Sequence, residues 1–111
     1  MYKPITEEMF QTHRAALGGL SQEIIDKKRH VYTQGNADIL HNFRLSSQMA
    51  NTTVGQQIAT HMIKQFVSVV NLMTRPDIID SEKDTRFADL RNYLDIAYVA
   101  YKEGAVHENT L

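Results

Sequence analysis

One run of apolar residues constrains the fold of this chain more than any other feature. Ile58, Met62, Phe66, Val69 and Met73 follow one another at steps of three or four residues. Because an α-helix has 3.6 residues per turn, this spacing puts all five side chains on one face. The sequence therefore predicts a helix over residues 53–74 that must be covered by another apolar surface.

A second apolar stripe predicts the partner of this helix, over residues 81–102. Its members recur at helical spacing before Gly104 and are Phe87, Leu90, Leu94, Ala97 and Tyr101. Pro76 separates the two helices, since its ring disfavours a helical conformation in the preceding residue. We expect the two helices to pack as an antiparallel pair. The predicted core of this pair consists of Met62, Phe66, Val69, Phe87, Leu90 and Leu94.

Shorter helices are predicted before this pair. Thr6 can cap a weaker helix within residues 1–20, which we expect to end at Gly18-Gly19. A second short helix is predicted over residues 21–29, followed by a turn at residues 32–36.

A third short helix is predicted from Asp38 to about residue 50, with Leu40, Phe43 and Met49 on its apolar side. No segment alternates like a strand. The sequence thus predicts one all-α domain over residues 1–111. We expect a compact bundle of about five helices with a frayed tail at residues 104–111.

The balance of charges and the lack of cysteine narrow the function. The chain has 12 Lys and Arg against 13 Asp and Glu, a net charge of -1, and no Cys. A neutral chain has no general field that draws it to a nucleic-acid backbone or an anionic membrane. Neither a signal peptide nor a membrane-spanning run is recognisable, so we expect a cytoplasmic protein with no membrane partner and no nucleic-acid coat.

Beside the apolar stripe of residues 81–102 runs a polar stripe. It consists of Glu82, Arg86, Asp89, Asn92 and Tyr93. Carboxylates in such a row can hold a divalent cation, while a guanidinium or an amide can hold an anionic or polar ligand. The alternative is an exposed row of ion pairs, in which Arg86 pairs with its neighbours one helical turn away.

Two further places could contact an anionic ligand. Lys64 lies on a polar edge of the helix over residues 53–74, and Lys28 precedes Tyr32 in a basic, aromatic and glycine-bearing helix–loop–helix. A loop that leads into a helix N-terminus can present free N–H groups to an anion. Both features also fit a structural role, as solvated surface and as a helix end with matching charges.

The combination of these motifs resembles small bacteriophage-type all-α proteins related to MazG-like nucleotide pyrophosphohydrolases. The resemblance covers roughly residues 24–101. Its motifs are Lys28-x-x-x-Tyr32 with Gly35, Asp38 and Asn42-Phe43, then Met62-Ile63-Lys64, then Glu82 and Asp89-Leu90-Arg91-Asn92-Tyr93-Leu94. The resemblance implies an oligomeric helical protein that hydrolyses a nucleotide between its α- and β-phosphates with Mg²⁺.

The resemblance also implies roles for individual residues. The expected catalytic residues are Glu82 and Asp89. The expected Mg²⁺ ligands are Glu82, Asp89 and Asn92. The expected nucleotide-binding residues are Lys28, Tyr32, Lys64, Arg86 and Asn92. Tyr32 would stack on the base, and the cations would hold the phosphates.

The chain departs from this pattern in its acidic pairs. They read Glu23-x-x-Asp26 and Asp89-x-x-Asn92, so that an amide stands where the superfamily has a carboxylate. Loss of a carboxylate weakens Mg²⁺ binding and metal-assisted catalysis. Three hypotheses remain: a nucleoside triphosphate pyrophosphohydrolase, an inactive binder that sequesters or senses a nucleotide, and a structural or protein-interaction helical module. The small, apolar-rich helical chain and the resemblance also predict a homo-oligomer, a dimer or larger.

Overall fold

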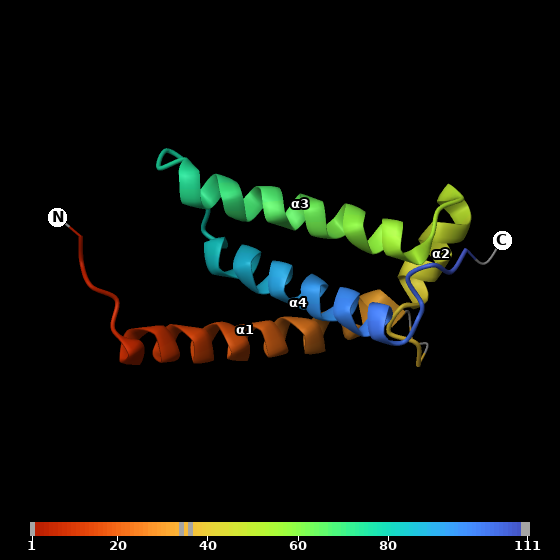
Figure 1. Cartoon of the computed structure of the whole chain (residues 1–111), viewed down its shortest axis with the longest axis horizontal. Helices are drawn as coiled ribbons and strands as arrows, with labels where there is room; N and C mark the ends of the chain where they lie inside the picture. The colour runs from red at the N-terminus through yellow and green to blue at the C-terminus, as the bar shows by residue number, and fades with distance from the viewer. Residues whose placement is uncertain (1, 34, 36, 110–111) are drawn as a thin grey trace.

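A computed structural model describes residues 2–33, 35 and 37–109, without the side chains of His30 and Tyr32. Within these residues all regular secondary structure is helical and no strand occurs, which confirms the all-α prediction. The helices are α1 (Glu7–Thr33), α2 (His41–Ala50), α3 (Val54–Thr74) and α4 (Lys83–Lys102). Helix α4 lies between α1 and α3, and the short α2 crosses one end of this layer (Figure 1).

The described residues form four helices, so the prediction of five was wrong. Thr6 begins α1 as expected, since its hydroxyl accepts the N–H of Met9 at 3.1 Å. The helix then continues through Gly18 and Gly19 instead of ending there. A glycine within a helix costs only about 1 kcal/mol relative to alanine, which packing along α4 can offset. Ser21 does not cap a new helix, because its hydroxyl donates to the carbonyl of Leu17 at 2.8 Å within α1.

The break between α2 and α3 lies where the sequence predicted it. Asn51 ends α2 in the left-handed region, with φ 53°, and its N–H bonds to carbonyls of the last turn. Thr53 then caps α3, because its hydroxyl accepts the N–H of Gln56 while the Gln56 side chain accepts the N–H of Thr53. This reciprocal pair accounts for the sharp start of α3.

The described part of the C-terminal tail is docked, so the prediction of a frayed tail was wrong for residues 105–109. Ala105 is only 3% exposed. The N–H groups of Val54 and Gly55 donate to the carbonyls of Glu108 and Val106 at 2.8 and 2.9 Å. The first N–H groups of a helix lack partners within the helix, and here the tail supplies them. The tail thereby completes the N-terminus of α3.

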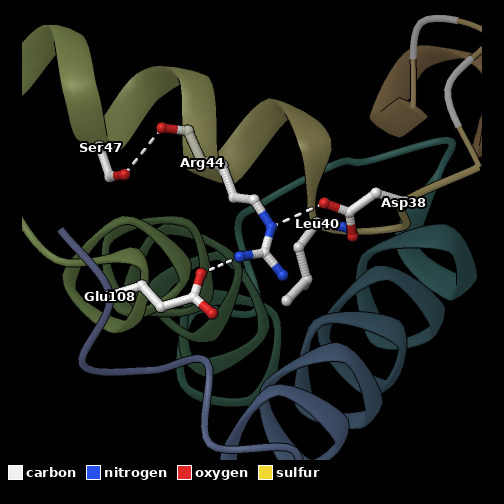
Figure 2. A network of polar contacts seen from close by, with 5 residues as sticks. All are labelled: Asp38, Leu40, Arg44, Ser47 and Glu108. Atoms are coloured by element: carbon white, nitrogen blue, oxygen red, sulfur yellow. Dashed lines mark hydrogen bonds and ion pairs between the residues drawn. The ribbon is translucent and has the colours of Figure 1, made fainter. Parts of the chain in front are cut away.

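One arginine ties this tail to α2 (Figure 2). Arg44 donates through Nε to Asp38 at 2.6 Å and pairs through Nη1 with Glu108. The other carboxylate oxygen of Asp38 accepts the N–H of Leu40 at 3.0 Å, just before α2 begins. The guanidinium of Arg44 therefore joins the start of α2 to the tail, 64 residues away in sequence.

The core lies where α2, α3, α4 and the tail meet, and it differs in part from the predicted core. Val69 is buried and Met62 is half-buried, as expected, but Phe66 is 56% and Leu94 is 57% exposed. Phe87 is also exposed, at 36%. The core cluster consists of Leu40, Phe43, Val54, Ile58, Ile96, Ala100 and Ala105.

Helix α4 is rotated about its own axis relative to the predicted orientation. It buries a face of small and polar residues, and its apolar stripe is left largely open to solvent. The buried residues are Ala88, Asp89, Asn92, Ile96 and Ala100. Small residues let helices approach closely, and α1 supplies partners for the two polar side chains. No helix in the described part of the chain combines the length and apolarity needed to cross a bilayer.

Candidate functional site

Polar and aromatic side chains gather on one side of the α3–α4 pair. Arg86, Asp89 and Tyr93 are three and four residues apart on α4 and therefore share one side of this helix. His61 and Lys64 are three residues apart on α3 and flank them. We call this side, together with Lys28 of α1, the polar face.

At one end of the polar face, Lys64 and Arg86 line the same surface cleft of about 360 Å³. The cleft lies between the second half of α3 and the start of α4, with Asp80 from the connecting segment and Ser68 on its wall. The structure thus brings together Lys64 and Arg86, two of the residues that the resemblance assigns to nucleotide binding. The cleft is open and polar, which suits a charged ligand.

Arg86 is held in place by two carboxylates. Its Nε donates to Asp80 at 3.1 Å, and its Nη2 lies 3.5 Å from Glu82. The backbone N–H of Glu82, at 2.8 Å, and the Arg86 hydrogen bond lower the pKa of Asp80. The same hydrogen bond and charge of Asp80 raise the pKa of Arg86. Glu82 thus orients the Arg86 guanidinium, as expected if the polar stripe of α4 is an exposed row of ion pairs.

Asp89 is similarly engaged. Its carboxylate is only 5% exposed and lies 3.3 Å from the ammonium of Lys28 on α1, which is half-exposed. The charge of Asp89 also contributes, more weakly than Asp80 and Glu82, to the raised pKa of Arg86. A buried carboxylate with a cationic partner is a counter-ion that fixes Lys28. It is poorly available to a metal.

The three expected Mg²⁺ ligands do not fit a divalent cation. Asn92 is 3% exposed, and its amide nitrogen donates to the backbone carbonyl of Ser21 at 3.0 Å. Glu82 is exposed and lies seven residues, or about 10 Å of helix, before Asp89. Among the described residues, no three His, Asp or Glu side chains are grouped closely enough to hold a metal. The structure does not bring Glu82 and Asp89, the two expected catalytic residues, together.

An aromatic cluster, which sequence reasoning missed, lies further along the polar face. The rings of His61 and Tyr93 are stacked, with centroids 5.7 Å apart and an interplanar angle of 7°. Phe43 of α2 meets both rings edge-on, at 5.6 and 6.4 Å. The sequence contained a signal for this cluster, because the antiparallel pairing that aligns Lys64 with Arg86 also brings His61 near Tyr93.

The segment from Lys28 to Tyr32 is helical, not a loop. Helix α1 continues to Thr33, and a turn with Gly35 at φ 79° follows. The expected base-stacking side chain of Tyr32 lies outside the described residues, as do Gln34 and Asn36 of the predicted turn. Lys28 therefore reaches the polar face from a helix. Among the described residues, the stacked rings of His61 and Tyr93 supply the aromatic surface of this face.

We expect His61 to make the fold sensitive to acid. Burial, and secondarily the charge of Lys64, lower its pKa below the ordinary 6.5. The unfolded chain therefore binds more protons than the native state as the pH falls through 6.5, and stability decreases in that range. His61→Phe retains a ring against Tyr93 without this titration. Between pH 7.5 and 5.5, the free energy of unfolding of this variant should fall less than that of the unmodified protein, as measured by urea denaturation. An equal fall in both proteins would contradict this role of His61.

Comparison of the chain with known protein families, with characterised proteins and with solved structures finds no match. The features of this chain that bear on its function are therefore those of the polar face: its cations, its stacked rings and its engaged carboxylates.

Proposed function

We propose that this protein binds a nucleotide on its polar face without hydrolysing it by a metal-dependent route. The observation that carries the proposal is that Lys64 and Arg86 line one cleft. A guanidinium and an ammonium are suited to phosphate oxygens, and Arg86 is preorganised by Asp80. Lys28, fixed by Asp89, adds a third cation on the same side of α4.

The stacked rings support a nucleotide over a simple anion. Tyr93 follows Arg86 by seven residues, which corresponds to about 10 Å along α4. An aromatic surface at that separation suits a base whose phosphates lie in the Lys64–Arg86 cleft, because every base has a face that can stack. We assign this role to His61 and Tyr93.

A binder is favoured over a pyrophosphohydrolase because the acidic and amide groups are already in use. Asp89 holds Lys28, Asn92 holds the Ser21 carbonyl, and Glu82 holds Arg86. A Mg²⁺-dependent mechanism would need at least two of these oxygen ligands to point at one ion. The protein would then sequester or sense a nucleotide.

The experiment is a panel of mono-, di-, tri- and cyclic nucleotides, tested by thermal unfolding with and without Mg²⁺. We expect stabilisation by at least one nucleotide, equally without Mg²⁺, and no release of pyrophosphate. Arg86→Ala and Lys64→Ala should each weaken binding about tenfold or more, since a hydrogen bond to a charged group contributes about 1.5–3 kcal/mol.

Lys27→Ala is the matched control. Lys27 is an exposed lysine on α1 whose ammonium pairs with Glu23 at 2.9 Å, and it is not part of the polar face. Its replacement should leave affinity unchanged. The proposal fails if no nucleotide shifts the unfolding of the intact protein. Release of pyrophosphate that requires Mg²⁺ and is lost in Asp89→Ala would instead restore the hydrolase hypothesis.

A second candidate function, a protein-interaction module, is favoured by one separate observation. Large apolar side chains of α3 and α4 remain exposed on the side of the helix pair opposite the polar face.

A further inference from the structure

Five large apolar side chains of α3 and α4, each between 56% and 69% exposed, form a set that we call the open face. The open face consists of Ile63 and Phe66 from α3, and of Leu94, Tyr98 and Tyr101 from α4. Scattered apolar residues are ordinary on a protein surface, but five on two adjacent helices need an explanation.

Helix geometry puts these residues on one side of the pair. On α4, Arg86 and Tyr93 border α3 on the polar face, and Leu94 and Tyr101 lie about 60–100° further around the helix. On α3, Lys64 borders the polar face and Phe66 lies about 160° away from it. Because the helices run antiparallel (Figure 1), both rotations lead to the same, opposite side of the layer.

The α3 side of the open face carries no charge. Helix α3 contains a single Lys, Arg, Asp or Glu over its 21 residues, and this residue, Lys64, belongs to the polar face. On α4, the exposed Arg91, Asp95 and Lys102 border the open face and carry charges of both signs. A two-fold axis can place opposite charges of such a border against each other, so the border is compatible with a second copy of the chain.

The exposed area of the chain leaves room for a partner of this size. The chain exposes 8064 Å², whereas a folded monomer of this mass exposes roughly 6,200 Å². Part of the difference of about 1,900 Å² belongs to the N-terminal segment, where Tyr2, Ile5 and Phe10 are 87%, 70% and 53% exposed. The difference is more than twice the roughly 800 Å² that each partner buries in a standard interface. The radius of gyration is also larger, at 16.3 Å, than the roughly 13 Å expected of a compact domain of this length.

We propose that a second copy of this chain covers the open face. The α3–α4 pairs of the two copies pack face to face across a two-fold axis and form a four-helix core. Both polar faces then point outward and stay accessible. This proposal rests on the open face and the area alone, so it stands or falls independently of nucleotide binding.

Sedimentation equilibrium of the intact chain tests the proposal. We expect twice the 12.7 kDa of the chain at micromolar concentration. Phe66→Glu and Leu94→Glu should each give a monomer at every concentration, with the helical circular dichroism retained. Met49→Glu is the matched control, because Met49 is an apolar residue of α2 that is 82% exposed and outside the open face. It should remain a dimer.

Two outcomes would overturn the proposal. One is a monomer mass for the unmodified chain that does not change with concentration. The other is a dimer that survives glutamate on the open face, which would locate the interface elsewhere. If either variant loses its helical signal, Tyr98→Glu replaces it, since Tyr98 is 61% exposed and its replacement should give a folded monomer.

Discussion

Replacing Lys28 by methionine is expected to lower the free energy of unfolding by about 2 kcal/mol. Methionine keeps most of the apolar stem of the side chain but removes the ammonium. The carboxylate of Asp89, which is 5% exposed, then loses its partner at 3.3 Å. Removing one partner of a fully buried ion pair costs about 3–5 kcal/mol. We expect less here because Lys28 is half-exposed, so water can reach the site. Urea denaturation measures the loss.

Two companion variants separate the ion pair from other contacts. Asp89→Asn should cost less than Lys28→Met, because it leaves a neutral amide in the buried position and a half-exposed ammonium that water can solvate. The double variant Lys28→Met with Asp89→Leu should recover part of the loss, since no buried charge remains. A loss below about 0.5 kcal/mol in Lys28→Met, the scale of ordinary surface changes, would contradict this account of Asp89.

Adding one methyl group at Gly55 should destabilise the fold, whereas the same change at Gly19 should stabilise it. A Cβ on Gly55 would lie 2.8 Å from the carbonyl oxygen of Val106, so the docked tail must move. We expect Gly55→Ala to cost about 2 kcal/mol, in the range of other overpacked sites. Gly19 lies within α1 and has nothing within 4 Å of its Cβ position, so Gly19→Ala should gain about 1 kcal/mol.

The same pair of variants tests whether the tail is part of the fold. In Gly55→Ala, the bonds from Val54 to Glu108 and from Gly55 to Val106 should lengthen or break. Hydrogen exchange at these two amides should become faster, while exchange in the middle of α1 stays unchanged. If Gly55→Ala is as stable as the unmodified protein, the tail does not complete the N-terminus of α3.

The local signals in the sequence predicted α3 well. The spacing of its apolar residues and the proline after it agree with the bounds Val54–Thr74. They agree because each signal acts within a few residues. The prediction that the first helix ends at Gly18-Gly19 was wrong because it also rested on a local signal. The free-energy cost of two glycines within a helix is smaller than the stabilisation that a continuous α1 gains by packing along α4.

The orientation of α4 could not be predicted from its periodicity. Its apolar stripe is clear, but the helix buries the other side, because α1 offers Lys28 and the Ser21 carbonyl to Asp89 and Asn92. Polar side chains can be buried when each finds a partner, and such partners lie far away in the sequence. The exposed Phe66 and Leu94 are the consequence.

The candidate site was predicted in part. The approach of Lys64 and Arg86 followed from pairing two helices antiparallel, and the structure has both on one cleft. The metal ligands were expected from the resemblance, and a motif along one helix does not reveal whether α1 already occupies a carboxylate. The stack of His61 on Tyr93 needs the rotation of both helices, which only the packed structure defines.

The most direct test of the central claim is a nucleotide titration followed by ¹H–¹⁵N NMR of the intact protein, without Mg²⁺. Binding at the polar face predicts shifts that are largest at Lys64 and Arg86 and that extend to His61 and Tyr93. The amides of Phe66 and Leu94, on the opposite side of the pair, should move much less. No shifts at millimolar nucleotide, or shifts centred on the open face, would contradict the claim.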